Sequence, residues 1–197
     1  EAKHIHLFKH FRRDFEAGFG CACVFIGPAE EVRNFVLSHS PLGVAIAILH
    51  IEWITLRHYI EGVKDNQDLD PQFKSLLKNH WLEESQHTKL DTLIVEDLAR
   101  NAIEGDIDRA IQEYGEIGAF LDNGIKQQAE FDIASFIHAT GRQLSKRERE
   151  DMTDAVLQGM RWTYLGTGMT HPNFLATIEQ ISPAGRKQIE ALAPAFC

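Results

Sequence analysis

Positive charge is scarce in this sequence. Its 197 residues contain 20 Lys and Arg against 29 Asp and Glu, which gives a formal net charge of −9. A surface with this excess of negative charge repels phosphate backbones and anionic lipid headgroups, and no local cluster of basic residues offsets it. We therefore expect neither nucleic-acid binding nor membrane-surface binding.

Long apolar runs and paired cysteines are also lacking. The apolar run over residues 42–49, for example, covers only eight residues, whereas a helix that spans a bilayer needs about 20 apolar residues. No apolar signal-peptide core follows the start of the chain. Cys21, Cys23 and Cys197 make an odd number without zinc-finger spacing, which suits a reducing compartment. These features predict a cytoplasmic protein.

Alternation of β-branched residues, the signature of strands, is almost absent, and this predicts an all-α chain. Ser40 before Pro41 and Asp70 before Pro71 are helix start signals, and residues 145–148 read as a capping box. The sequence predicts four long helices, over residues of about 41–63, 70–102, 106–140 and 145–170. Shorter helices are predicted over residues of about 3–17, 29–38, 173–181 and 184–192. A turn signal at residues 122–124 would kink or split the third long helix.

This pattern predicts a single helical domain over residues 1–197, because no linker or repeat divides the chain. Residues 41–171 would form a four-helix bundle. Residues 1–40 and 172–197 would add short helices to it.

Ionisable residues interrupt the apolar faces of the first two long helices. Glu52 lies in the middle of the apolar stripe of helix 41–63, whereas His50, His58 and Glu61 point away from that stripe and are expected at its rim. The inner stripe of helix 70–102 has four ionisable residues where apolar ones are expected, namely His80, Glu84, His87 and Asp91. Burying such a set without compensation would cost several kcal/mol per charge.

Metal coordination would remove that cost. Glu84 and His87 form a Glu-x-x-His motif, which places a carboxylate and an imidazole on adjacent turns of one helix face. Glu52 and Glu84 each lie 16 residues from position 68, in the turn between the two helices. In an antiparallel hairpin they therefore face each other, which predicts a shared metal site.

Further residues are assigned supporting roles. Asp91 could accept a proton from the imidazole nitrogen of His87 that does not bind metal, and His80 could be an additional ligand. Tyr59, about two turns beyond Glu52, could be a redox-active phenol near the site. The histidines at positions 4, 6 and 10 are read as part of a mobile terminus.

With Glu52 on one helix and Glu84 and His87 on the next, the chain resembles the ferritin-like di-iron carboxylate superfamily. The resemblance implies a four-helix bundle that holds two iron ions, or manganese and iron, and an oxidoreductase that uses O₂ or peroxide on a small molecule. A homodimer is the default for a bundle of this class. The superfamily order calls for a Glu on the third helix, which makes Glu130 a candidate. His171 is a further candidate ligand, because it is the only His that the fourth helix offers, at its far end, and this helix lacks a Glu-x-x-His motif.

Two other hypotheses remain for the polar stripe. It could be a buried ion-pair network in a non-catalytic bundle that acts through an interaction surface. It could also form a single-metal site from Glu52, Glu84 and His87 alone. Metal stoichiometry distinguishes all three hypotheses.

Overall fold

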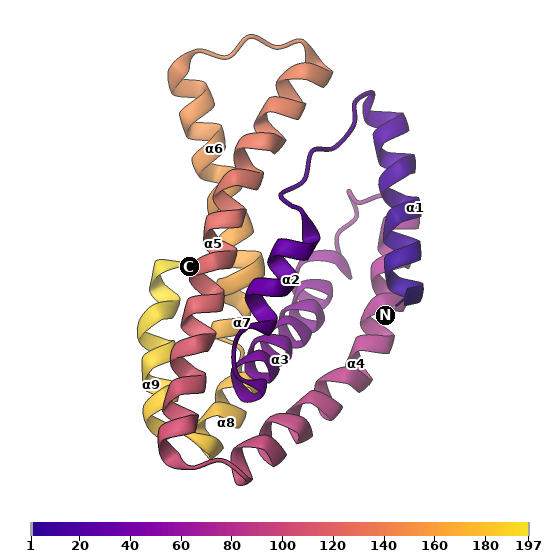
Figure 1. Cartoon of the computed structure of the whole chain (residues 1–197). Coiled ribbons are helices and arrows are strands. Elements are labelled where there is room, and N and C mark those ends of the chain that lie inside the picture. The colour runs from indigo at the N-terminus through magenta and orange to yellow at the C-terminus, as the bar shows by residue number, and fades with distance from the viewer. Residues whose placement is uncertain (1, 197) are drawn as a thin grey trace.

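In the part of the chain that the structure describes, all regular secondary structure is helical. Figure 1 shows the computed structural model, which describes residues 2–196, with the backbone alone for Glu104; Cys197 lies outside this range. The elements are α1 (Ala2–Phe19), α2 (Ala29–Leu37), α3 (Pro41–His58), η1 (Tyr59–Val63), α4 (Pro71–Arg100), α5 (Glu104–Thr140), α6 (Lys146–Arg161), η2 (Trp162–Gly166), α7 (Thr167–Met169), α8 (Pro172–Ile181), α9 (Pro183–Leu192) and η3 (Ala193–Ala195). The all-α prediction is confirmed.

The long helices begin where the sequence signals predict. The side chains of Ser40, Asp70 and Ser145 each accept a hydrogen bond from the backbone N–H three residues further on. Glu148 completes a capping box at the start of α6. These bonds satisfy N–H groups that the first turn of a helix leaves without intrahelical partners.

The turn signal at residues 122–124 does not break α5, so the expected kink or split is wrong. Asp122 is buried, and its carboxylate accepts hydrogen bonds from Arg161 of α6 at 2.6 and 2.9 Å. Its side chain is thus held by a neighbouring helix rather than by the local turn bonds that Asp forms when it ends a helix.

Helix α3 lies at the centre of the packing. It contacts α4, α5, α7 and α8, which cover most of its surface and leave Ile48 and Ile51 exposed. His50, which the sequence placed at a rim, is therefore buried: only 4% of it is exposed. Its Nε2–H donates to the carbonyl of Tyr164 at 3.1 Å and its Nδ1 accepts from the Tyr114 hydroxyl at 2.9 Å. Burial lowers the pKa of His50 to about 4, so the ring is neutral near pH 7.

Two π-helical turns extend the long helices. Residues 59–63 continue α3 as η1, and residues 162–166 continue α6 as η2. A π turn inserts an additional residue and shifts the phase of the faces that follow. Within the first of these turns, Ile60 is 44% exposed and Val63 is buried.

The N-terminal helix packs away from the later helices. In Figure 1, α4 diverges from α5, and α1 lies along α4. Residues 20–28 then lead towards α5, where the Ile26 N–H donates to Gln128 Oε1 at 3.1 Å and Gln128 Nε2–H donates to the Val24 carbonyl at 2.8 Å. One surface of α4 is thereby covered by residues that precede α3 in the sequence.

The contact between α7 and α3 depends on Gly168. A Cβ atom at this position would clash with the His50 ring and with Ile54. We expect Gly168→Ala to lower the free energy of unfolding by about 1–3 kcal/mol, the usual cost of overpacking. Gly159→Ala is the matched control, because nothing lies within 4 Å of its added Cβ. It should stabilise α6 by about 0.5–1 kcal/mol. Urea unfolding measures the free energy of unfolding of both variants. An equal change in the two variants would contradict the close α3–α7 contact.

Candidate metal centre

Glu84 is the centre of the polar cluster on α4. Its side chain is only 5% exposed. His80 lies one turn before Glu84 and His87 one turn after it, so the three side chains share one helix face. His80 Nε2 lies 2.7 Å from Glu84 Oε1, and His87 Nδ1 lies 2.5 Å from Glu84 Oε2. The two carboxylate oxygens thus face different histidines.

Helix α1 supplies a third histidine. His4 Nδ1 lies 3.0 Å from Glu84 Oε1, on the same oxygen as His80. Its ring is buried and packs edge-on against His80, with 4.7 Å between ring centroids. The prediction that His4 belongs to a mobile terminus is wrong, because α1 is an ordered helix that packs on α4 and buries this ring.

Helix α3 supplies a second carboxylate. Glu52, Glu84 and His87 each offer one ligand atom, and these atoms lie within 4.8 Å of one another. The structure therefore brings together the three residues that the hairpin register and the Glu-x-x-His motif select. His4, His80 and Glu84 form a second group by the same measure.

The two groups suit metal ions in their donor chemistry. Together they offer two carboxylates and three imidazoles and no thiolate, a set that suits iron, manganese and zinc. Glu84 belongs to both groups, so its two oxygens could each serve one ion. A buried carboxylate among imidazoles has a compensating charge when such an ion binds, which offsets the cost of its burial.

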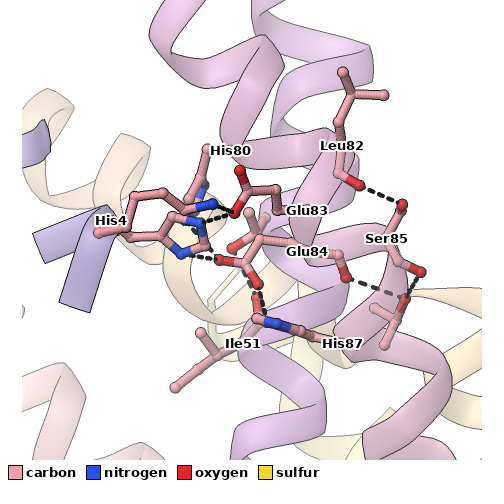
Figure 2. A network of polar contacts seen from close by, with 11 residues as sticks. His4, Ile51, His80, Leu82, Glu83, Glu84, Ser85 and His87 are labelled. Atoms are coloured by element: carbon pink, nitrogen blue, oxygen red, sulfur yellow. Dashed lines mark hydrogen bonds and ion pairs between the residues drawn. The ribbon is translucent and has the colours of Figure 1, made fainter. Parts of the chain in front are cut away.

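Glu83 holds His4 from the other side. His4 Nε2 lies 2.9 Å from Glu83 Oε2, and Lys3 Nζ lies 2.5 Å from the same oxygen (Figure 2). Hydrogen bonds from Lys3 and His4 hold the pKa of the Glu83 carboxyl below its usual range. The ionised Glu83 carboxylate accepts a hydrogen bond from His4 Nε2–H, so the ring proton stays on Nε2 and Nδ1 is directed at Glu84. A carboxylate commonly orients a metal-binding histidine in this way.

The structure places Glu130 and His171 elsewhere, and neither belongs to the two groups. Glu130 is exposed on α5, where Arg149 donates to its Oε2 at 3.2 Å. His171 caps α8, and its ring stacks on Trp53 with 4.4 Å between centroids. Helices α5 and α6 pair with each other, while α1 approaches the α4 face, so the structure does not bring these two residues to the cluster.

The remaining predicted residues lie near the cluster. Asp91 is half-buried on α4, one turn beyond His87. Tyr59 is buried at the start of η1, and its ring lies 5.2 Å from that of Trp81. Tyr59 and His80 line the same cavity, of about 320 Å³, between α3, α4 and η2. The phenol thus shares a cavity with one histidine of the cluster.

A larger cavity reaches the cluster from α1. It has a volume of about 620 Å³, and His4 and His80 form part of its wall. The other lining residues come from α1 and from residues 20–28, and most of them are apolar. The cluster is therefore accessible from an apolar space.

His4 and Glu83 are the cluster residues that sequence reasoning missed as functional. A signal for His4 was present, since His4, Phe8, Phe11 and Phe15 recur at helical spacing and mark one face of an amphipathic helix. Glu83 carried no such signal, because it lies beside the inner stripe of α4 and is engaged only through α1.

No family model matches the chain, and no curated protein or solved structure is significantly similar to it. Within residues 2–196, no helix has both the length and the apolar character to cross a membrane.

The ion pair between Asp122 and Arg161 occupies the inner side of α5 that faces α6. Hydrogen bonds from Arg161, supported by Lys126, hold the pKa of Asp122 below its usual range. Asp122→Asn should therefore lower the free energy of unfolding at pH 7 by about 1–3 kcal/mol. The stabilisation of the fold by the ionised Asp122 carboxylate is complete above the unfolded-state pKa of about 4. It disappears as the pH falls through the lower folded-state pKa.

Urea unfolding between pH 7 and pH 3 measures this difference. Asp108→Asn, at an exposed position of α5, is the control and should have little effect at any pH. A loss for Asp122→Asn that stays constant down to pH 3 would contradict the role of the ionised carboxylate.

Proposed function

We propose that this chain is a dinuclear metal protein of the ferritin-like kind that binds two iron ions, or manganese and iron, around Glu84. One ion would use His4, His80 and Glu84, and the other Glu52, Glu84 and His87. The observation that carries the proposal is that both groups share Glu84, with His4 and His80 on Oε1 and His87 on Oε2. Glu84 would thus help to hold both ions, because it belongs to both groups.

The proposed activity is oxidation of a small molecule with O₂ or peroxide. Iron held by carboxylates and imidazoles supplies the redox change and the position at which O₂ or peroxide reacts. The residues of the chain would bind the ions and orient their ligands. Glu84 and Glu52 balance the charge of the ions, Glu83 holds the His4 ring in place, and Phe8, whose ring lies 5.1 Å from that of His80, covers the histidine from solvent.

The donor set departs from the superfamily pattern in its second half. The resemblance calls for ligands from the third and fourth long helices, whereas the proposed set takes His4 from α1 and His80 from α4. The ferritin-like assignment therefore depends on Glu52, Glu84 and His87, and on the succession of four long helices α3 to α6. The ligands from α1 are a proposal specific to this chain.

Metal stoichiometry tests the proposal. After anaerobic loading with Fe(II), the wild-type chain should hold about two ions, because each carboxylate oxygen of Glu84 serves one group. His4→Ala should retain about one ion and Glu84→Gln none. Glu130→Gln is the matched control and should retain the wild-type amount, since Glu130 lies outside both groups.

Elemental analysis gives the ion count, and thermal unfolding verifies that each variant is folded. One ion in the wild type, unchanged in His4→Ala, would support the single-site alternative and contradict the dinuclear centre. No ion in the wild type would leave a buried ion-pair network as the better account.

A second prediction concerns Glu83, which contacts His4 but belongs to neither ligand group. Glu83→Gln should weaken binding of the ion nearest His4 by about 10–100-fold, the usual effect of removing a carboxylate that orients a ligand histidine. Competition with a chromophoric chelator measures the affinity. Glu96→Gln, further along α4, is the control, and an equal loss in both variants would contradict an orienting role for Glu83.

A further inference from the structure

The cavity beside His4 and His80 has the properties of a binding site for an amphipathic ligand. We propose that it binds a long-chain aliphatic carboxylate; the role of that molecule as a substrate rests on the function proposed above. Three features of the cavity support this ligand: its apolar lining, the charges within it, and the distance from those charges to the histidines.

The lining is mainly apolar and aromatic. The cavity has a volume of about 620 Å³, within the range of about 300–1,000 Å³ typical of small-molecule sites. Its wall contains four phenylalanines, of which Phe8, Phe15 and Phe25 are 37%, 48% and 52% exposed. Such clustered exposed aromatic surface is unfavourable in water and is typical of ligand-binding sites. An aliphatic chain would cover it.

Residues 20–28 close one side of this space. Cys23 and Phe25 belong to its wall. Gln128 of α5 holds the neighbouring backbone through the bonds to Val24 and Ile26 described above. The wall thus has a defined position at both α1 and the connecting segment, as a binding site requires.

The ionised groups in the lining are cationic. Lys9 and Arg12 line the cavity together with His4 and His80, and no carboxylate is among the residues that line it. The Arg12 guanidinium lies 5.1 Å from the centroid of the Phe25 ring, and its Nε lies 3.8 Å from Glu16 Oε1. A ligand with one anionic end therefore finds cations beside an aromatic surface, which favours a carboxylate over an alcohol or an ammonium.

The helix spacing separates the two ends of the site. Lys9 and Arg12 lie five and eight residues after His4, which corresponds to about 8–12 Å along the axis of α1. A carboxylate held by these cations would place carbon atoms remote from it beside His4 and His80. The geometry therefore points to a reaction along the chain or at its far end, rather than at the carboxylate carbon.

Binding of chemically matched probes tests this inference on the full chain without metal. Isothermal titration with dodecanoate, dodecanol and butanoate separates the contribution of the charge from that of the chain. Dodecanoate should bind at least about 10-fold more tightly than either of the others, because only dodecanoate uses both the cations and the aromatic wall. Equal affinity for dodecanoate and butanoate would overturn the proposal.

Variants assign the two contributions to residues. The double variant Lys9→Gln, Arg12→Gln should bind dodecanoate about 10–100-fold more weakly than the wild type and should bind dodecanol with unchanged affinity. Arg13→Gln is the matched control on the same helix, because Arg13 does not line the cavity. Phe15→Asp should weaken both long-chain probes, whereas Leu37→Asp, at an exposed position of α2, should weaken neither.

A second copy of the chain is the competing occupant of this aromatic surface. A wild-type dimer that Phe15→Asp converts to a monomer, together with no binding of dodecanoate, would overturn the proposal. Metal analysis of the same preparations separates the two hypotheses. If the chain takes up two ions after Fe(II) loading but does not bind dodecanoate, only the ligand is rejected. If the chain binds dodecanoate but takes up no Fe(II), the site is supported and its role in oxidation is rejected.

Discussion

The burial of one carboxylate organises this molecule. Glu84 lies where α1, α3 and α4 meet, and three imidazoles surround it with ring nitrogens 2.5–3.0 Å from its oxygens. An ionised group in such a position is costly unless opposite charge or metal compensates it. The arrangement of α1 against α4 follows from this requirement, because α1 brings both the third imidazole and part of the cover over the cluster.

The cluster also explains why the first half of the chain differs in character from the second. Between α5 and α6, the inner carboxylate of Asp122 is held by Arg161, whose guanidinium provides two hydrogen bonds and a full positive charge. Around Glu84, the partners are histidines, which are neutral when they bind a metal and so leave the negative charge for the ion. Similar helix packing thus carries a structural ion pair in one half and a candidate metal centre in the other.

Much of the local structure could be predicted from the sequence, because it depends on signals within a few residues. The capping residues Ser40, Asp70 and Ser145 begin their helices as predicted, and the hairpin register places Glu52 near Glu84. The predictions that were wrong concern features that depend on tertiary contacts. His50 is buried because Tyr114 of α5 and residues 164–168 pack on its side of α3, which helical periodicity cannot anticipate.

The ligands illustrate the same limit. Glu84 and His87 share one face of one helix, so spacing alone associates them. His4 reaches them from a helix that is separated from α4 by more than fifty residues, and nothing local indicates which of the long helices α1 will cover. Glu130 and His171 were selected from the order of helices in a resembling superfamily, and here α5 and α6 use their inner surfaces to pack on each other.

One consequence concerns the wall between the two cavities. Phe8 and His80 line both the larger cavity under α1 and the smaller one that contains Tyr59. These two side chains therefore form a shared partition, and its position depends on the rotamer of His80. A metal ion that fixes this imidazole would also fix the partition.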